Sequence, residues 1–576
     1  MIMKRIISIV LALLLAAAAY AGPVSKEKAL DYARQFFNLK STSSLEIVWT
    51  GSGASANAPF YAINNSKGGF IIVSGEEAVN PVLGYSHSGR FAVANMPDNI
   101  LGWFDSLEKD IKEVRKRNIS QSEEVAEMWA FRTAKTKAAG EVILETATWG
   151  QGSPYNDLCD VKGGKAVTGC VATAMAIVLR YLGYPEHGTG TLPSYYTSTT
   201  KEEIKGYSID DHFYKWDKMP LDDNDVKKAS DEQKLQIAQL MHDCGVMVNM
   251  DYTTSSSGAF SWNIGPALSK YMGYCSSAND ISKSVYSPAE WISMLMSEID
   301  SDMPVLYAAT DSRGAGGHQF VIDGYDAEGK LHVNWGWNGK NNGFYAINLQ
   351  VGSYSFSNNQ SAVIGLAPDP EHKSSPKFEL ELSNAGLSIE SGTIKKDTEF
   401  SVNFDYICNT TRYEFKGDVA AALLGKDDVI KEVISEPEET TIKAATSTGT
   451  YYICRGTLPC KIKGDIGFHD KVGLVFRSSS DPTWNVVKYG RTPGIIGYIS
   501  ATPYMFLDTK TRYSAGDILD LNLIINQEEL NDIEWYFDGE RNYGVPVALT
   551  PGDHELKAVV KKKDGVEILV QNISVQ

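Results

Sequence analysis

Cysteine and basic residues are both scarce in this chain. Only 7 of its 576 residues are cysteines, which excludes a small scaffold held together by disulfides. Lys and Arg number 54 against 71 Asp and Glu, so the formal net charge is -17. A surface of this sign repels phosphate backbones and anionic lipid head groups, and we therefore expect no nucleic acid partner.

Long hydrophobic runs are also lacking, apart from one at the N-terminus. There, Lys4 and Arg5 precede the apolar run Ile6–Ala19, and the small-residue pattern Ala19–Ala21 follows. The run is short for a membrane span, so the pattern predicts a secretory signal peptide over residues 1–21, with a membrane anchor as the alternative. We expect a protein that is secreted or held at the cell surface, with the periplasm left open, and a mature form without a membrane span.

An odd number of cysteines in an exported chain leaves at least one thiol free or paired between molecules. Cys454 can pair with Cys460 or with Cys408, and the spacing alone does not decide between them. The question is which thiol is free, and why.

Composition and turn signals divide the rest of the chain into four parts. Residues 22–140 alternate between helical and strand patterns, which predicts an α+β unit. Its last stretch, 132–140, lacks a buried pattern and would be accessible to a protease. Residues 141–368 also predict an α+β domain, with a helix over 170–182 and strands near 320–325, 331–335 and 343–347.

A linker rich in proline and polar residues follows at 368–376. Beyond it, short alternating segments predict all-β, immunoglobulin-like sandwich modules. A break near residues 492–497 divides this tail into two modules, at 377–493 and 498–576.

Cys170 lies where a loop enters a predicted helix rich in small residues. The positive end of the helix dipole and the nearby amide N–H groups favour a thiolate there. His318 follows a glycine-rich approach, Gly314–Gly317, that leaves room around the imidazole. The two residues together predict a thiolate–imidazolium pair, with Cys170 as nucleophile and His318 as general base. Taken alone, each residue has another interpretation: Cys170 fits a small core residue, and His318 fits a histidine in a turn.

Two further segments fit this pair. The amide of Asn334 can orient the histidine, and the indole of Trp335 can cover their hydrogen bond. Gln151, upstream of the cysteine, can form an oxyanion hole together with the backbone N–H of Cys170. The order Gln, Cys, His, Asn–Trp within one domain favours the catalytic interpretation of all four segments over plain packing.

The residues that carry this order resemble the streptopain family of cysteine peptidases, the C10 group of the papain-like clan. The match spans nearly all of 145–350, and the stretches that carry it include Trp149–Gln151, Gly169–Ala176, Gly317–Tyr325 and His332–Trp337. Segments near 60–64, 68–75 and 83–85 resemble the inhibitory propeptide of the same family. Gln319 departs from the small residue expected after the histidine, and the long tail is absent from the shortest members.

The resemblance implies an α+β, papain-like catalytic domain of two subdomains over 141–368, with an inhibitory propeptide over 22–140. It implies a secreted cysteine endopeptidase made as a zymogen, acting on protein or peptide substrates and inhibited by its own propeptide. It also implies a cleft bordered by Ser257, Gly258 and Ala259, and we place Gly317 beside them. The histidines show no metal-ligand spacing, and we expect no cofactor.

Two other functions remain open. The same Cys–His pair can hydrolyse cell-wall peptides or transfer acyl groups. The protein can instead be mainly an adhesin, with the β modules binding host protein or glycan and proteolysis secondary.

Overall fold

The structure, a computed structural model, describes most of the chain between residues 22 and 575. The stretches of this range outside the description are 52–56, 97, 131–139, 287, 311–316, 348–349, 352–353, 356–359, 426–427, 446–451, 468–469, 490–496, 502–503, 507–517, 520–522, 526–531, 543–546 and 563–564. The expected signal peptide, residues 1–21, lies outside the described residues, and so does most of the stretch expected to be cut on activation.

The N-terminal unit is α+β, as predicted. Its first helix begins after Ser25, whose hydroxyl accepts a hydrogen bond from the backbone N–H of Lys28 at 3.2 Å and caps the helix. The elements of this unit are α2 (Lys26–Phe36), β1 (Leu45–Trp49), β2 (Phe60–Asn65), β3 (Phe70–Ser74), β4 (Val82–Ser86), α3 (Asp98–Lys116) and α4 (Glu123–Trp129).

In the following domain most of the helices come before the longer strands, which confirms the expected α+β class. Its helices are α5 (Cys170–Leu182), α6 (Asp223–Lys228), α7 (Asp231–Met247), α8 (Ile264–Met272) and α9 (Pro288–Asp300), with 3-10 turns η2 (Trp216–Lys218), η3 (Ser261–Asn263) and η4 (Lys283–Val285). Its strands are β5 (Val142–Ile143), β6 (Asp160–Val161), β7 (Gly164–Lys165), β8 (Tyr195–Tyr196), β9 (Glu203–Ile204), β10 (Asn279–Ser282), β11 (Val305–Thr310), β12 (Gly317–Tyr325), β13 (Leu331–Asn334), β14 (Gly343–Tyr345), β15 (Gln350–Val351), β16 (Tyr354–Ser355) and β17 (Gln360–Ile364).

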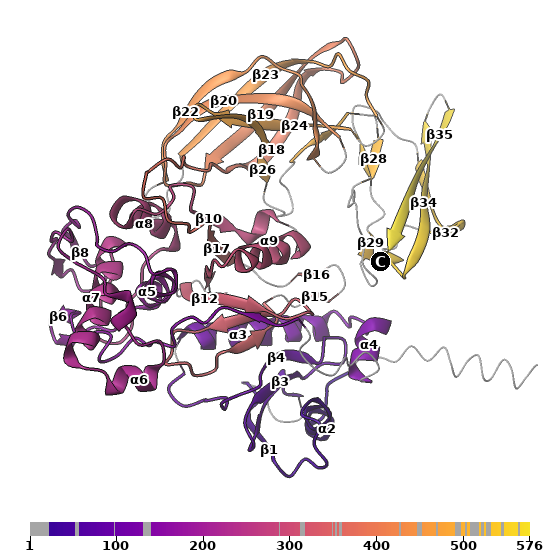
Figure 1. The fold of residues 1–576 in the computed structure, drawn as a ribbon. Coiled ribbons are helices and arrows are strands. Elements are labelled where there is room, and N and C mark those ends of the chain that lie inside the picture. Colours follow the sequence, from indigo (N-terminus) through magenta and orange to yellow (C-terminus); the bar gives the residue numbers. More distant parts are fainter. Residues whose placement is uncertain are drawn as a thin grey trace, which may run out of the picture.

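One sheet runs through both units. Its strand order is β1-β2-β3-β4-β14-β13-β12-β11-β17-β10, with β5 paired to β12. The two units meet where β4 pairs antiparallel with β14, Tyr85 opposite Phe344 and Gly84 opposite Tyr345. The sequence patterns predicted some strands of each unit, among them β12, β13 and β14, but not that the two units share one sheet (Figure 1).

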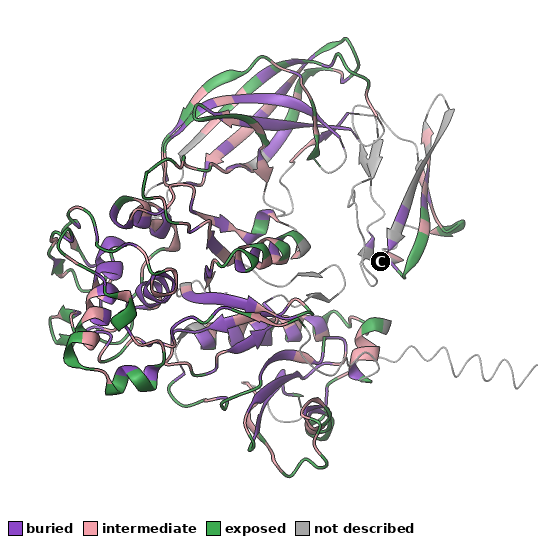
Figure 2. Ribbon diagram, in the orientation of Figure 1, coloured by how far each residue is buried: buried purple, intermediate pink, exposed green. Residues whose placement is uncertain are grey.

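Helices cover both faces of this sheet, because alternate strand residues are apolar on each side. One face packs against α3 and α9 in a core that includes Phe320, Trp335 and Tyr345. The opposite face packs against α2 at the N-terminal end and against α5 at the other end, where Val321 belongs to the α5 core. Figure 2 shows the strands between these helices as buried along most of their length.

The tail contains a β-sandwich formed by two facing sheets that share one core, as predicted. The strands of the first sheet are β23 (Tyr452–Lys461), β19 (Glu399–Asn409), β18 (Leu380–Gly392) and β26 (Lys488–Tyr489). Those of the second are β21 (Ile430–Val433), β20 (Phe415–Leu424), β24 (Lys471–Ser478), β25 (Asp481–Val486), β22 (Glu438–Ile442) and β27 (Ile499–Ser500).

This sandwich extends past the break expected near residue 493, because Ile499 pairs with Val472 and both belong to the shared core. The strands that follow are β28 (Tyr504–Phe506), β29 (Ile518–Leu519), β30 (Leu523–Ile525), β31 (Asp532–Phe537), β32 (Glu540–Asn542), β33 (Val547–Ala548), β34 (Gly552–Lys562) and β35 (Gly565–Val575). Residues of β29, β31, β33, β34 and β35 contribute to a smaller core. Within the described part of the chain, no helix is both long enough and apolar enough to cross a membrane.

Candidate active site

Cys170 is the first residue of α5, where the sequence predicted it. Gly169 precedes it at φ 85°, a conformation that favours glycine. A Cβ on Gly169 would lie 2.7 Å from Met250 Sδ and 2.9 Å from the Ser257 carbonyl oxygen, so only glycine fits there. The sharp entry leaves Cys170 half-buried at the positive end of the helix dipole.

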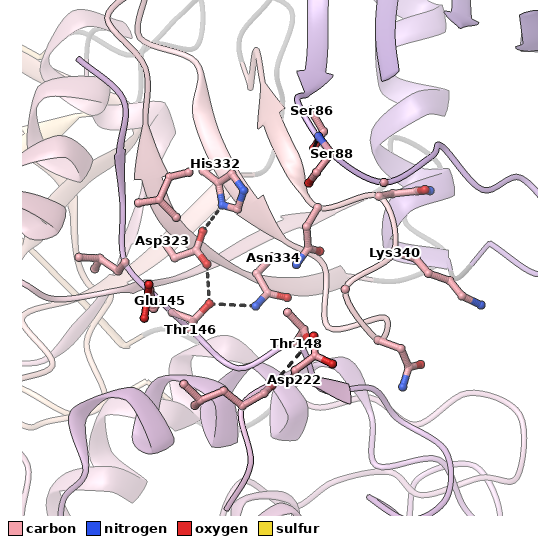
Figure 3. A pocket seen from close by; sticks show the side chains of 18 of the residues that line it. Ser86, Ser88, Glu145, Thr146, Thr148, Asp222, Asp323, His332, Asn334 and Lys340 are labelled. Atoms are coloured by element: carbon pink, nitrogen blue, oxygen red, sulfur yellow. Dashed lines mark hydrogen bonds and ion pairs between the residues drawn. The ribbon is translucent and has the colours of Figure 1, made fainter. Parts of the chain in front are cut away.

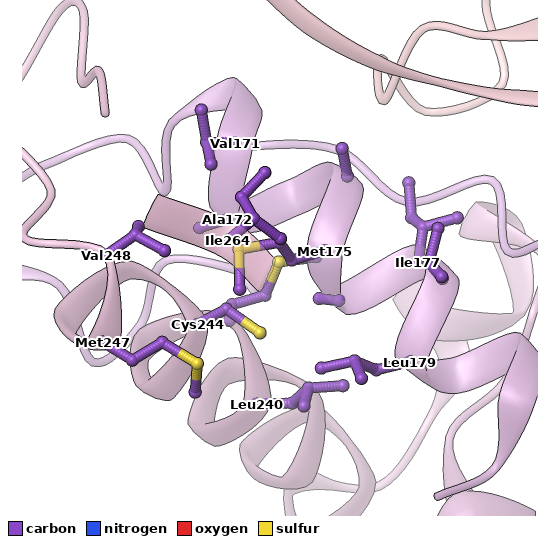
Figure 4. Close-up of a cluster of buried hydrophobic side chains, with 14 of the residues drawn as sticks. Val171, Ala172, Met175, Ile177, Leu179, Leu240, Cys244, Met247, Val248 and Ile264 are labelled. Atoms are coloured by element: carbon purple, nitrogen blue, oxygen red, sulfur yellow. The ribbon is translucent and has the colours of Figure 1, made fainter. Parts of the chain in front are cut away.

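The rest of α5 is anchored in the core. Its buried face packs against α7 and α8, with Met175 and Leu179 among the α5 side chains and Leu240, Cys244 and Ile264 opposite them (Figure 4). The helix ends at Gly183, in the left-handed conformation typical of a C-cap. Burial on this scale fixes the position of the first turn, and with it Cys170.

The N-terminal end of β12 lies against this turn. The backbone N–H of Gln319 is 3.5 Å from Cys170 Sγ. His318, the preceding residue, is half-buried and pairs with Ala309 of β11. By strand alternation His318 lies on the same sheet face as Phe320, which packs at 4.9 Å from Trp335. The structure thus brings the β12 backbone to the nucleophile candidate and puts the candidate histidine on the Trp335 face.

Gln151 also lies close to the start of α5. Its carbonyl accepts a hydrogen bond from the backbone N–H of Thr168 at 3.1 Å, two residues before Cys170. The segment before it is anchored by the fully buried Trp149, whose indole N–H donates to the Pro220 carbonyl at 2.8 Å. The Gln151 backbone therefore lies close to the start of α5, and the expected role of its amide in an oxyanion hole stays a prediction.

Asn334 ends β13 and is 1% exposed. Its amide nitrogen donates to Thr146 Oγ1 and to the Ala147 carbonyl, both at 2.9 Å, and its amide oxygen accepts from the Gly336 N–H at 3.2 Å. In this form the Asn334 amide is therefore engaged by the segment before Gln151 and by the turn after β13. Its expected role in orienting His318 stays a prediction.

Trp335 is buried under the N-terminal unit. Its ring lies 6.3 Å from that of Trp103 on α3 and 5.2 Å from that of Tyr345. Its indole N–H donates to the Asn341 carbonyl at 3.0 Å. The tryptophan expected to shield the catalytic hydrogen bond thus also contacts the expected propeptide.

The expected cleft segment lies beside Cys170 as well. The Ser257 carbonyl approaches Gly169, and Gly258 is exposed and pairs with Asp251. Ala259 is half-buried and packs against the α5 core, while Gly317 begins β12. Three of these four residues therefore lie on the segment that follows Asp251, and the fourth lies at the start of the histidine strand.

Gln319, the departure from the family pattern, is 2% exposed. Its amide oxygen accepts a hydrogen bond from the Ser261 hydroxyl at 2.6 Å. Its backbone, rather than its side chain, makes the contact with Cys170. Sequence reasoning did not single out Ser261, because nothing in the spacing links η3 to β12.

Burial makes three of the other cysteines poor nucleophiles. Burial raises the pKa of Cys159 and of Cys460 to about 12 and that of Cys454 to about 11. The structure describes all seven cysteines and none forms a disulfide. Cys454 and Cys460 lie six residues apart on the single extended strand β23, too far to pair.

Comparisons with known proteins agree with this arrangement. Residues 149–345 match the Peptidase C10 family. Streptopain from Streptococcus pyogenes is 34% identical over 343 residues, which cover 82% of streptopain and 55% of this chain. The chain belongs to the peptidase C10 family. It is therefore a cysteine-type peptidase related to streptopain.

Other similarities extend over the N-terminal unit of this C10 peptidase. Residues 21–111 match the Spi protease inhibitor family, which supports a propeptide-like inhibitor domain. The thiol protease/hemagglutinin PrtT from Porphyromonas gingivalis is 33% identical over 390 residues, 64% of this chain, and the match spans 44% of that longer protein. The solved structure of a Prevotella intermedia prointerpain A fragment is 29% identical, with a TM-score of 0.47 over 57% of this chain and 99% of that one.

A cavity of about 600 Å³ lies between the propeptide-like unit and the catalytic domain. The propeptide side contributes Ser86, Ser88 and Arg90, and the catalytic side includes Asn334. Figure 3 shows His332, Asp323, Thr146 and Asn334 joined by hydrogen bonds at this cavity. Sequence reasoning missed the first three as functional residues, although Asp323 and His332 lie within the motifs that carry the family resemblance.

Proposed function

We propose that this C10 peptidase is a secreted cysteine endopeptidase made as a zymogen, with Cys170 as nucleophile and His318 as its acid–base partner. The observation that carries the proposal is the 3.5 Å contact between the Gln319 N–H and Cys170 Sγ. This contact brings the strand that begins with Gly317 and His318 to the helix end where a thiolate is favoured.

The proposed reaction proceeds through an acyl-enzyme. The Cys170 thiolate attacks the peptide carbonyl carbon, and His318 protonates the leaving amine as the C–N bond breaks. Neutral His318 then accepts a proton from water, which attacks the thioester and releases the acid, and the Cys170 thiolate and the imidazolium are restored. In this proposal Gln151 stabilises the oxyanion, Asn334 orients His318, and Trp335 excludes water from their hydrogen bond.

The propeptide-like unit acts in this proposal as an intramolecular inhibitor. It extends the catalytic sheet through β4, and Trp103 packs on Trp335. The backbone of Ala92 also exchanges two hydrogen bonds with the Asn341 side chain, in the turn after β13. Release of this unit is therefore expected to rearrange the surroundings of Trp335 and to open the site.

The proposed substrates are proteins and peptides that bind across Ser257–Ala259 and Gly317. Casein and peptidoglycan fragments, assayed side by side with activated enzyme, distinguish an endopeptidase from a cell-wall peptide hydrolase. We expect cleavage of casein, and cleavage of the peptidoglycan fragments alone would contradict this choice of substrate.

The central test compares residues 22–576 with the same chain carrying Cys170→Ala. We expect the wild type to shorten by most of residues 22–140, as followed by mass, and then to digest casein, while the variant stays full length and inactive. Cys275→Ala is the control, because Cys275 is a half-buried thiol of the same domain that we expect to be dispensable. A Cys170→Ala chain that digests casein would exclude the proposed nucleophile.

Export is proposed from the N-terminal pattern and tested separately. The full chain, expressed in a bacterium with a general secretion pathway, should be found outside the cytoplasm. Its first residue should then be Gly22, as read by N-terminal sequencing. A chain that retains residues 1–21 would contradict the signal peptide.

A further inference from the structure

Four side chains at the cavity between the two units form a buried polar chain, His332–Asp323–Thr146–Asn334. His332 Nδ1 lies 2.5 Å from Asp323 Oδ1, and Thr146 Oγ1 lies 2.5 Å from Asp323 Oδ2. Thr146 Oγ1 in turn lies 2.9 Å from Asn334 Nδ2. Asp323 is 3% exposed and Asn334 1%, so each depends on these partners for most of its hydrogen bonds.

The direction of each hydrogen bond in the buried polar chain is determined by its neighbour. The Asp323 carboxylate can only accept, so the single hydroxyl proton of Thr146 points to it. The Thr146 oxygen then accepts from the Asn334 amide, whose second N–H donates to the Ala147 carbonyl. A flipped Asn334 amide would set its oxygen against the Ala147 carbonyl oxygen, so only one orientation satisfies all partners.

The buried polar chain joins three segments that each carry a proposed site residue. Thr146 lies on the segment that leads to Gln151, Asp323 lies on the strand that begins with His318, and Asn334 precedes Trp335. The backbone adds one bond of its own between the first two segments, from the Leu144 N–H to the Asp323 carbonyl at 2.7 Å. Past β5, none of the described residues from Leu144 to Gln151 belongs to a strand. These bonds hold the first part of the segment, and bonds from Thr148 to the Leu221 carbonyl and from Trp149 to the Pro220 carbonyl hold the part next to Gln151.

We propose that Thr146 and Asp323 are positioning residues of this peptidase: they hold the Gln151 segment and the Asn334 amide in register with the strand that carries His318. The inference rests on the proposed function, because it gives these residues a role only through Gln151, His318 and Asn334. Loss of the Thr146 hydroxyl lets the two segments move relative to each other, which weakens stabilisation of the transition state more than binding of the substrate.

Thr146→Val tests this proposal, because valine keeps the shape and removes the hydroxyl. In the activated full chain, with active sites counted by iodoacetamide titration, kcat should fall by about ten- to a hundredfold while KM stays within about twofold. Thr146→Ser should restore kcat to within about threefold of wild type, since serine restores the hydroxyl.

Thr148→Val is the matched control. Thr148 lies two residues further along the same segment, and its hydroxyl accepts from the backbone N–H of Asp223 rather than contacting Asn334. Its loss should leave kcat within about twofold. Equal kcat values for Thr146→Val, Thr148→Val and wild type would overturn the proposal.

Asp323→Asn keeps the test decisive if Thr146→Val does not fold. An asparagine amide can donate to Thr146 and reverse the direction of the hydrogen bonds, so the same loss of kcat at an unchanged KM is expected. An unchanged kcat overturns the proposal, and so does failure of both variants to fold, because the buried polar chain would then serve the fold alone. If Cys170→Ala retains activity, it is the proposed function that fails.

Discussion

At the scale of single residues, the position of Cys170 depends on the glycine before it. Gly169 lets the chain enter α5 sharply enough to present the thiol at the helix end, where the backbone N–H of Gln319 reaches it. The proposed chemistry therefore depends on a residue that has no side chain to react.

Gly169→Ala tests this link. The added Cβ meets Met250 and the Ser257 carbonyl, and the positive φ adds strain, so Cys170 must shift. We expect kcat to fall by about ten- to a hundredfold in a protein that still folds, measured by casein hydrolysis and circular dichroism.

Gly183→Ala at the other end of α5 is the matched control. Gly183 also has a positive φ, 60°, but a Cβ there meets nothing within 4 Å. This variant should lose about 1 kcal/mol of stability and keep its activity. Equal activity losses in the two glycine variants would contradict a specific role for the entry to α5.

At the scale of elements, the pairing of β4 with β14 attaches the propeptide-like unit to the catalytic sheet. Gly84 makes the pairing possible, because a Cβ there would lie 2.7 Å from the Tyr345 ring. Gly84→Ala should weaken the docking by about 1–3 kcal/mol and speed self-processing several-fold, as followed by mass.

Gly22→Ala is the control, because Gly22 lies at an open position of the same unit. This variant should be processed at the wild-type rate, and equal processing rates for both variants would contradict this role of β4.

A second element-scale feature is the buried carboxylate of Asp243 on α7. It accepts from Tyr214 Oη at 2.8 Å and from His212 Nδ1 at 2.9 Å. The hydrogen bond to Asp243 raises the pKa of His212 above its usual value. A raised histidine pKa stabilises the fold below the unfolded-state value of about 6.5 and ceases to do so as pH rises through the folded-state value.

His212→Asn should therefore cost more stability near pH 5.5 than near pH 8.5, as measured by urea unfolding at both pH values. Tyr214→Phe removes another hydrogen bond to the Asp243 carboxylate. The Tyr214 hydroxyl stays protonated at both pH values, because burial raises the pKa of Tyr214 well above its ordinary value. Its cost should be the same at both pH values. A cost of His212→Asn that does not change with pH would contradict the assignment.

The elements differ in how far the sequence predicts them. The bounds expected for α5 agree with the structure because Gly169 and Gly183 punctuate the helix. The pairing of β4 with β14 could not be predicted. The residue pattern of a strand specifies which side chains face a core, but it does not specify which other strand pairs with its edge. The same holds for Thr146 and Asp323, whose contact joins positions 177 residues apart.

The residues of the candidate site also differ in how far the sequence predicts them. Motifs predicted Cys170, His318 and Gln151, and the structure brings the backbones around all three to the start of α5. For Asn334 the motif indicated the residue but not its partners, since hydrogen bonds to Thr146 and Ala147 depend on the path of the chain before Gln151.

At the scale of the whole molecule, the tail has its own core, and polar contacts join it to the catalytic domain. Tyr286 donates a hydrogen bond to Glu379, and the ammonium of Lys488 lies 5.0 Å from the Tyr286 ring. The linker itself contacts the catalytic domain, where the Ser276 N–H donates to the Ser374 hydroxyl at 2.8 Å.

Removal of residues 377–576 should therefore leave a folded peptidase, because the cut keeps the contacts of Ser374 and spares the catalytic cores. We expect casein hydrolysis within about threefold of the full chain after activation. A folded but inactive truncated protein would show that the sandwich supports the site. Loss of binding to host surfaces with activity intact would favour an adhesive role for the tail.

The thiolate–imidazolium pair is the central claim, and the rate of alkylation by iodoacetamide tests it most directly. In the activated enzyme near pH 6, where a free thiol of pKa about 8.5 is almost wholly protonated, mass mapping should find one fast adduct, on Cys170. His318→Ala should slow that adduct by more than about tenfold at this pH while the other cysteines react as before. A fast adduct on another cysteine, or a Cys170 rate that does not change in His318→Ala, would contradict the account.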